Sequence, residues 1–390
     1  MTRGSEIVTS MFEEFCEAFG VWDEARPYLG LMVDEEEMRL VLALGQESCT
    51  VAEVAGRLGL EPGAAAALLD GAYGRHIVDR IPERSGVDSI PERSGVDSIP
   101  ERSGVDREMG EDQALFKASR FDRRLNQVAK HGRWTEVPEE ARRALDHHFL
   151  GVFVEQHRPA VEAMMRAHQG GEPEPAIEGR RPPNDALLLL HEVEEMIDAA
   201  AHVALEPCDC RRLGEHCARP VDTCIWMDDM ALEALERGHG RRLSREEAKE
   251  VVRRADKAGL MHTGDSMWQE RGLGAICNCC ACDCYPFRAA QILGSKGTWP
   301  RSRYLARYDP EACNLCGACV KRCHFGAFYH DSVPERSGAD GKRVVAFASR
   351  GAGAEGRKKA PVSYDPALCW GCGLCANTCP SGAITIEALP

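Results

Sequence analysis

Apolar residues recur at helical spacing between residues 34 and 79. The first segment, DEEEMRLVLALG, has an acidic first turn, and its apolar positions are Met38, Leu40, Val41 and Leu44. The second segment, TVAEVAGRLGL, opens with Thr50, a good helix N-cap, and carries apolar residues one helical turn apart. EPGAAAALLDGAYGRHIVDR then predicts a third helix. The pattern therefore predicts a small helical unit.

Downstream, the same periodicity predicts helices over residues 112–168. It also predicts a helix over the segment DALLLLHEVEEMIDAA, which begins at Asp185 and has Asn184 as its expected N-cap. The strand-like segment HVALEPC follows, and then two helices, MDDMALEALERG and SREEAKEVVRRADKAGLMH. Ser244 is the expected cap of the second one. Gly170–Pro183 is rich in Gly, Pro and Arg, so we expect a linker there.

A nine-residue unit interrupts these patterns. Residues 81–107 contain IPERSGVD three times in tandem, and a near copy, VPERSGADG, occupies residues 333–341. The Pro, Ser, Gly and charged residues of this unit cannot bury a core. We interpret both segments as exposed flexible loops without a function of their own.

The order of the three N-terminal helices resembles a winged helix-turn-helix. The third helix is Ala-rich and has almost no basic residues, and the chain of 390 residues carries a formal net charge of −14. A broad nucleic-acid footprint would be basic, so DNA is not expected as a partner. Many such units mediate protein contacts instead, and an acidic surface suits docking to a basic face of a partner protein.

The N-terminal segment MTRGSEIVTSMFEEFCEAFG lacks the basic region and apolar core of a signal peptide. The longest aliphatic stretch, ALLLL, is too short to span a bilayer. We therefore expect a cytoplasmic protein without a membrane segment.

Cysteine is concentrated in the second half of the chain. Of 19 cysteines, only Cys16 and Cys49 lie in the first 200 residues, and neither has a neighbour at ligand spacing, so both are expected to be small buried hydrophobic residues. The other seventeen lie between Cys208 and Cys379. An odd number of thiols in a cytosolic chain argues against a disulfide framework, and short spacings favour metal binding.

The two C-terminal segments CNLCGACVKRCH and CWGCGLCANTCP each follow C-x2-C-x2-C-x3-C, the bacterial run for [4Fe–4S] clusters. In each motif the first three thiolates bind one cube-shaped [4Fe–4S] cluster. A helical turn then places the fourth cysteine beside the other cluster. One predicted cluster therefore takes Cys313, Cys316, Cys319 and Cys379. The other takes Cys369, Cys372, Cys375 and Cys323. Zinc is disfavoured here because it prefers paired C-x2-C knuckles.

Residues Tyr304–Ile386 resemble the two-cluster [4Fe–4S] ferredoxin family of the 8Fe–8S type. The resemblance rests on the two cysteine runs, on the lead-ins YDPEAC and YDPALC, and on CPSGAITI after the last cysteine. His324 departs from it, because the family usually has Pro there, and the stretch between Cys323 and Cys369 is long. The resemblance implies two [4Fe–4S] clusters and electron transfer.

A second group of cysteines lies upstream, and we predict that all nine are metal ligands. CDCRRLGEHCARPVDTC holds Cys208, Cys210, Cys217 and Cys224. ICNCCACDC holds Cys277, Cys279, Cys280, Cys282 and Cys284. This layout, from about Leu188 to the C-terminus, is similar to a group of iron–sulfur proteins in which such segments precede a ferredoxin module. The resemblance implies a ferredoxin-like electron carrier of anaerobic metabolism.

In an extended segment successive side chains alternate faces. Cys277 and Cys279 would then point one way, and Cys280, Cys282 and Cys284 the other, unless the segment forms a tight loop. Nine thiols suffice for two four-cysteine clusters with one thiol to spare, each cluster taking ligands from both segments. A single further cluster, or zinc, is the alternative. We thus expect two [4Fe–4S] clusters in the C-terminal module and one or two more in Cys208–Cys284.

These patterns predict an α+β chain. Its expected parts are a helical winged-helix-like unit (1–80), a repeat loop (81–110), a helical segment with a linker (111–183), a helix-rich cysteine domain (184–300) and a ferredoxin-like two-[4Fe–4S] module (301–390).

The sequence lacks a Gly-rich phosphate loop at the required spacing, a nucleophile elbow and H-E-x-x-H, so we expect no site for nicotinamide, flavin or ATP. No catalytic acid–base set stands out, and whether the chain is itself an enzyme stays open. The expected function is a multi-cluster iron–sulfur electron-transfer protein or subunit that serves a partner oxidoreductase. Two alternatives are an iron–sulfur redox-sensing DNA-binding regulator and a redox enzyme that uses an upstream cluster catalytically.

Overall fold

The structure is a computed structural model that describes residues 3–81, 114–171, 182–183, 185–330 and 360–389. The nine-residue repeat beyond Ile81 and its near copy lie outside the described residues. So do residues 172–181 of the predicted linker and the predicted cap Asn184.

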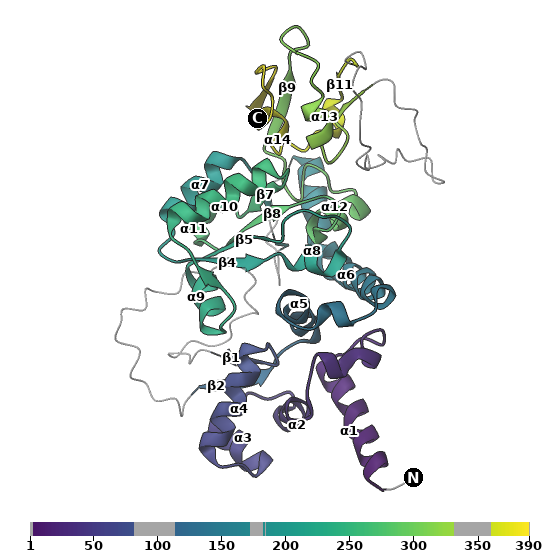
Figure 1. Ribbon diagram of the computed structural model, residues 1–390, viewed down its shortest axis with the longest axis vertical. Coiled ribbons are helices and arrows are strands. Elements are labelled where there is room, and N and C mark those ends of the chain that lie inside the picture. The colour runs from purple at the N-terminus through teal and green to yellow at the C-terminus, as the bar shows by residue number, and fades with distance from the viewer. Residues whose placement is uncertain (1–2, 82–113, 172–181, 184, 331–359, 390) are drawn as a thin grey trace.

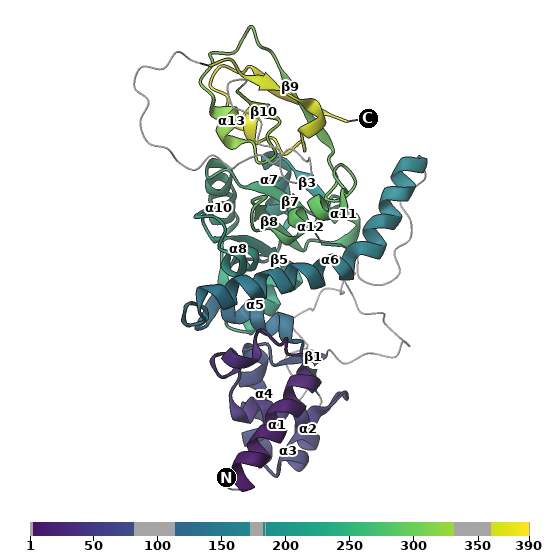
Figure 2. The same cartoon turned by 90° about the vertical axis from the view of Figure 1, so that its right-hand side faces the viewer.

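Three parts follow one another along the long axis of the molecule (Figure 1). N-terminal helices occupy one end, a mixed part with a β-sheet occupies the middle, and the C-terminal cysteine motifs occupy the other end. The long helix α6 (Glu139–Gly170) crosses the middle part and extends beyond it (Figure 2). Helices and sheets together confirm the α+β class.

The N-terminal part contains the three predicted helices and a strand pair. In chain order its elements are α1 (Arg3–Phe19), the short 3₁₀ helix η1 (Arg26–Leu31), α2 (Glu35–Leu44), α3 (Val51–Leu58), α4 (Pro62–Gly74), β1 (Val78–Ile81) and β2 (Leu115–Ala118). Thr50 caps α3 as predicted: its Oγ1 accepts a hydrogen bond from the Glu53 amide at 3.3 Å. Strands β1 and β2 pair antiparallel.

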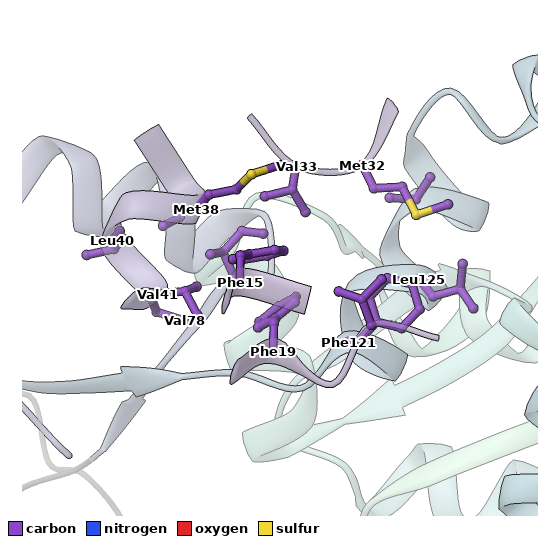
Figure 3. Close-up of a cluster of buried hydrophobic side chains, with 14 of the residues drawn as sticks. Phe15, Phe19, Met32, Val33, Met38, Leu40, Val41, Val78, Phe121 and Leu125 are labelled. Carbon is purple, nitrogen blue, oxygen red and sulfur yellow. The ribbon is translucent and has the colours of Figure 1, made fainter. Parts of the chain in front are cut away.

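Apolar side chains from all of these helices meet in one core, which continues into α5 (Phe121–His131) (Figure 3). Phe15 and Leu40 are fully buried in it. Cys16 and Cys49 lie in the same core, each 1% exposed, which confirms that they pack as small hydrophobic residues. Helices predicted over 112–168 are present as α5, η4 (Trp134–Glu136) and α6, but the prediction is wrong for residues 115–118, which form β2 and pair with β1.

The middle part is built on a six-stranded sheet that the sequence patterns did not reveal. Its strand order is β3-β7-β8-β5-β4-β6, and every neighbouring pair is antiparallel. The strands are β3 (Ala186–Leu188), β4 (Val203–Pro207), β5 (Asp222–Met227), β6 (Arg241–Arg242), β7 (Met261–Gly264) and β8 (Ala275–Cys279). The helices are α7 (Leu190–Ala199), α8 (Asp209–Gly214), α9 (Asp228–Glu236), α10 (Arg245–Lys257), α11 (Trp268–Arg271) and α12 (Tyr285–Leu293).

The helix predicted from Asp185 is wrong in its first turn. Residues 186–188 form β3 and pair with β7, and α7 begins only at Leu190. All three residues of β3 are buried, and the run of leucines gave no sign of the strand pairing. The Glu192 carboxylate accepts a hydrogen bond from the Leu189 amide at 2.7 Å, which fixes where the helix starts. The predicted strand β4 and helices α9 and α10 are confirmed.

The C-terminal part repeats one pattern twice, a cysteine loop followed by a short helix. Strand β9 (Tyr304–Tyr308) pairs antiparallel with β12 (Ile384–Ala388), and β10 (Phe328–Tyr329) pairs with β11 (Ser363–Tyr364). The two short helices are α13 (Ala318–Arg322) and α14 (Leu374–Asn377). In the part of the chain that the structure describes, no helix is both long and apolar enough to cross a membrane.

Candidate metal centres

Two recesses in the C-terminal part are lined by the eight ferredoxin-type cysteines. The first encloses about 270 Å³ of space, part of it open to solvent, and its thiols come from Cys313, Cys316, Cys319 and Cys379. The second encloses about 360 Å³ and its thiols come from Cys369, Cys372, Cys375 and Cys323. Each recess thus combines three cysteines of one motif with the fourth cysteine of the other. These are the two sets that the spacing predicts.

Backbone amides point at several of these sulfurs. The Leu315 amide donates to Cys313 Sγ at 3.4 Å, and the Gly371 amide donates to Cys369 Sγ at the same distance. The Ala327 amide donates to Cys323 Sγ at 3.2 Å. Such N–H donors favour the thiolate form of a sulfur and raise the potential of a cluster bound to it.

Gly371 shows why small residues occur inside these motifs. Its φ is +72°, and a Cβ built on it would lie 2.1 Å from the carbonyl oxygen of Tyr304. Only glycine therefore lets the second cysteine loop approach β9 this closely.

The two recesses differ in exposure. Cys316 at the first recess is exposed, whereas the second is covered by the buried side chains of Trp370 and Leu374. Burial raises the pKa of the Cys372 thiol to about 12. A thiol in such surroundings is costly to ionise on its own, so a bound cation or cluster is needed to hold it as thiolate.

The C-terminal part is fastened to the middle part near Cys323. The Arg322 guanidinium donates to the carbonyl oxygens of Asp256 and Lys257, both at 2.7 Å, at the end of α10. His324 is 6% exposed, and its Nε2 lies 2.7 Å from the Gly259 carbonyl oxygen. Burial lowers the pKa of His324 to about 4, so the ring is neutral and donates this hydrogen bond. The residue that replaces the family's usual Pro is thus an interface residue.

The nine upstream thiols fall into two groups. Six of them contact one another in a closed ring that runs Cys208, Cys210, Cys284, Cys279, Cys277 and Cys224. We call this group the six-thiol ring. Burial, followed by the hydrogen bond with Cys210, raises the pKa of Cys284 well above the usual range of a thiol. The ring therefore lies in an apolar environment that favours neutral thiols unless a metal is bound.

The other three thiols gather around a carboxylate. The sulfurs of Cys217, Cys280 and Cys282 and a carboxylate oxygen of Asp283 all lie within 4.8 Å of one another. Cys217 Sγ is 3.8 Å from Cys280 Sγ and 3.0 Å from Asp283 Oδ2. We call this group the three-thiol site.

Both groups contain thiols from both upstream segments. Cys277 and Cys279 lie in one group and Cys280 and Cys282 in the other, which confirms the predicted alternation of faces for these four. The prediction is wrong for Cys284, whose Sγ lies 3.2 Å from that of Cys279. Strand β8 ends at Cys279 and a turn follows, so the chain folds back before α12. The nine thiols divide as six and three, rather than as four and four with one spare.

Arg211 lies between the two groups and was missed from the sequence. It is 3% exposed, and its guanidinium donates to the Asn278 carbonyl oxygen at 2.8 Å and to Thr223 Oγ1 at 2.5 Å. Its charge interacts with thiols of both groups, first with Cys208 and also with Cys280. Nothing in the segment CDCRRLGEH distinguishes this arginine from its exposed neighbour Arg212.

Residues 312–383 match the family model of the 4Fe-4S dicluster domain. No curated protein and no solved structure matches the chain. The matched segment covers all eight cysteines that line the two recesses. The C-terminal part is therefore a ferredoxin-like iron–sulfur module for two [4Fe–4S] clusters, and its chemistry is electron transfer.

Proposed function

We propose that the protein is a multi-cluster iron–sulfur electron-transfer protein or subunit that exchanges single electrons with a partner oxidoreductase. One observation carries the proposal: one apolar cluster joins the two recesses to each other, and a second joins the second recess to the six-thiol ring. The first cluster contains Cys319 and Cys375, one from each recess. The second contains Cys372 of the second recess and Cys277, Cys279 and Cys284 of the ring.

In this proposal each recess holds one [4Fe–4S] cluster on its four thiolates. Such a cluster supplies one-electron chemistry when bound. The chain fixes the thiolates on two short loops and donates backbone N–H groups to the sulfurs. Each motif gives three thiols to one recess and its fourth thiol to the other recess. The two cysteine loops are therefore linked through both recesses.

The six-thiol ring is the proposed site of a third cluster. Its sulfurs touch in sequence around a closed ring, and among the described residues no three of them lie within 4.8 Å of one another. Four thiolates suffice for a cube, so two thiols of the ring exceed that need.

Aromatic side chains fill the space between the second recess and the ring. The rings of Phe325 and Trp370 stack with centroids 4.4 Å apart, and Phe287 meets Trp370 edge-on at 5.5 Å. Phe287 belongs to α12, which begins directly after Cys284. These side chains exclude water along the line between the two sites.

The partner is proposed to dock at the first recess. Cys316 is exposed there, and the neighbouring side chains of Asp309 and Glu311 are exposed as well. Acidic residues at this end, in a chain of net charge −14, suit a partner with a basic face.

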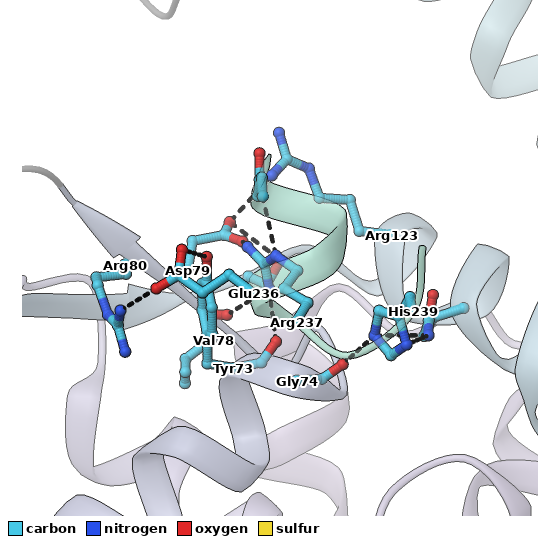
Figure 4. Close-up of polar contacts among 12 residues, drawn as sticks. Tyr73, Gly74, Val78, Asp79, Arg80, Arg123, Glu236, Arg237 and His239 are labelled. Atoms are coloured by element: carbon cyan, nitrogen blue, oxygen red, sulfur yellow. Dashed lines mark hydrogen bonds and ion pairs between the residues drawn. The ribbon is translucent and has the colours of Figure 1, made fainter. Parts of the chain in front are cut away.

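The N-terminal part is proposed to be a winged-helix-like unit for protein contacts. The C-terminal end of its helix α4 and the strand β1 contact the end of α9 in the middle part (Figure 4). Arg237 donates to the Tyr73 carbonyl oxygen at 2.6 Å and to Asp79 Oδ1 at 3.0 Å. This surface is therefore occupied by protein.

Metal analysis of anaerobically purified protein tests the proposal. We expect at least about eight iron and eight sulfide per chain from the C-terminal module, and about twelve with the ring loaded. A value of about four or fewer in protein with intact cysteines would sink the proposal.

Cys379→Ser tests the assignment of ligands. This change should disturb the EPR signal of the cluster held by Cys313, Cys316 and Cys319, and Cys323→Ser is the matched variant for the other cluster. Spectra in which each change damages the cluster of its own motif would contradict the assignment.

A further inference from the structure

The three-thiol site differs in kind from the other cysteine groups. We propose that Cys217, Cys280, Cys282 and Asp283 bind a single Zn²⁺ ion, separate from every iron–sulfur cluster. The proposed electron-transfer function neither includes nor requires this ion, and Asp283 is not a ligand that cysteine spacing reveals.

The spacing of the donor atoms fits one ion. In a tetrahedral site with Zn–S bonds of about 2.3 Å, neighbouring sulfurs lie about 3.8 Å apart. Cys217 Sγ and Cys280 Sγ are 3.8 Å apart, and Asp283 Oδ2 lies 3.4 Å from Cys280 Sγ. All four donor atoms lie within 4.8 Å of one another. Three thiolates and a carboxylate complete the four positions of a closed zinc site.

The other thiols of the chain provide an internal comparison. Within the described residues, this is the only group of three thiols whose sulfurs all lie within 4.8 Å of one another. The eight ferredoxin-type thiols line two recesses, and the sulfurs of the six-thiol ring touch only in pairs along the ring. A cube places iron and sulfide between its thiolates and separates them, whereas a single ion draws its ligands together.

The carboxylate is held in position by contacts on its far side. Asp283 is fully buried, and its Oδ1 accepts a hydrogen bond from the His216 amide at 2.8 Å and lies 2.9 Å from His216 Nδ1. The other oxygen, Oδ2, faces the thiols. Gly214 lets the chain approach, because a Cβ there would lie 2.6 Å from Asp283 Oδ1. Ligating carboxylates are commonly oriented in this way by a second shell of hydrogen bonds.

The surrounding charges balance such a site. Three thiolates, one carboxylate and Zn²⁺ leave a formal charge of minus two. The Arg219 guanidinium lies 3.7 Å from Cys282 Sγ, and the buried Arg211 interacts with Cys280. Two positive charges therefore compensate two negative ones at a half-buried site, where an uncompensated charge would be costly.

The position of the site indicates what the ion would do. Cys217 follows α8, whereas Cys280, Cys282 and Asp283 lie in the turn between β8 and α12. Cys280 also packs against Ala255 and Leu260, beside the Gly259 carbonyl that contacts His324. The ion would thus fix the turn that also supplies thiols to the six-thiol ring, next to the interface with the C-terminal module.

Metal analysis of paired variants tests the proposal. Anaerobically purified wild-type protein, dialysed against a chelator, should retain about one zinc per chain beside its iron and sulfide. Cys282→Ser should lower the zinc at least about tenfold and leave iron and sulfide unchanged. Cys372→Ser, at the second recess, should lower iron and sulfide and leave the zinc in place.

Asp283→Asn provides a milder test if Cys282→Ser fails to fold. It keeps the volume of the side chain but removes the anionic ligand, so chelator competition should show zinc bound at least about tenfold more weakly. X-ray absorption at the zinc edge of wild-type protein should show three sulfurs at about 2.3 Å and one oxygen at about 2.0 Å. Wild-type protein that lacks zinc, or a loss of iron and sulfide in Cys282→Ser, would overturn the proposal. Low iron in wild-type protein with zinc retained would instead count against the electron-transfer function alone.

Discussion

At the scale of single residues, close contacts decide which side chains can replace the glycines of the cysteine loops. Gly371 lies under the Tyr304 carbonyl with a positive φ, whereas Gly382 in the same module has a similar φ of +67° and no atom near its Cβ position. Comparing substitutions at these two glycines therefore distinguishes the effect of backbone strain from the effect of a steric clash.

Gly371→Ala should disrupt the loop of Cys369, Cys372 and Cys375. The left-handed backbone alone costs about 1–2 kcal/mol for alanine, and the clash with Tyr304 adds to this. We expect the loss of about four iron per chain, measured by metal analysis. Gly382→Ala should suffer only the backbone strain and retain the iron content of the wild type. An equal loss of iron in both variants would refute the steric argument.

His76 is a titratable residue in the interface between the N-terminal and middle parts. Burial, and after it the charge of Arg237, lowers the pKa of His76 to about 2. Between about pH 6.5 and pH 2 the unfolded chain therefore binds a proton at this residue that the folded chain does not. The folded state is favoured above about pH 6.5 and loses stability as the pH falls below it.

His76→Asn should flatten this pH dependence. Asparagine tolerates the φ of +57° at this position and does not titrate. Urea unfolding measures the free energy of unfolding at about pH 7 and pH 5. This free energy should fall less on acidification in the variant than in the wild type, and the difference should be at most about 1.4 kcal/mol per pH unit. An unchanged dependence in the variant would show that His76 is not the titrating group.

At the scale of elements, α10 connects the sheet to the C-terminal module. Its apolar residues Ala248, Val251 and Val252 pack in the core of the middle part. At its C-terminal end the carbonyl oxygens of Asp256 and Lys257 accept hydrogen bonds from Arg322. A cation at this end also interacts favourably with the helix dipole.

The N-cap of α10 gives a prediction at this scale. Ser244 Oγ accepts a hydrogen bond from the Glu247 amide at 3.3 Å, and the Glu247 carboxylate accepts one from the Ser244 amide at 2.8 Å. Ser244→Ala should lower the free energy of unfolding by about 1 kcal/mol, measured by denaturant titration with circular dichroism. Ser244→Asp retains a capping oxygen and should lose much less, so equal losses would argue against the cap.

At the scale of the whole molecule, Arg237 fastens the N-terminal part to the middle part (Figure 4). Its side chain is 3% exposed, and its guanidinium lies over the Tyr73 ring, 3.9 Å from the centroid. It also pairs with Asp79 and Glu233. Nearby, Arg80 forms an ion pair with Glu236 across the same interface.

Arg237→Ala should loosen the N-terminal part without affecting the clusters. The change removes one hydrogen bond to the Tyr73 carbonyl oxygen, one to Asp79 and the contact over the Tyr73 ring, so we expect a loss of about 2 kcal/mol. Limited proteolysis should release an N-terminal fragment, while the iron content stays that of the wild type. Arg241→Ala removes an arginine that is 59% exposed and should change neither readout.

Much of the C-terminal module could be predicted because its geometry is local. The spacing of Cys313, Cys316 and Cys319 is set by one short loop, and the cross-over of Cys379 follows from a helical turn after each motif. The caps at Thr50 and Ser244 are local in the same sense, because each depends on a residue three positions away.

The tertiary structure decided what depends on distant segments. The six-stranded sheet unites strands from residues 186–279, and neither its order nor the strand character of Ala186–Leu188 follows from periodicity. Cys284 joins Cys279 because a turn reverses the chain, and Asp283 meets Cys217 across 66 residues. The sequence by itself placed seventeen thiols between Cys208 and Cys379 and predicted that they bind metal. The division of the nine upstream thiols into a ring of six and a site of three was decided by how the turn after β8 folds against α8, because contacts between distant segments leave no spacing pattern in the chain.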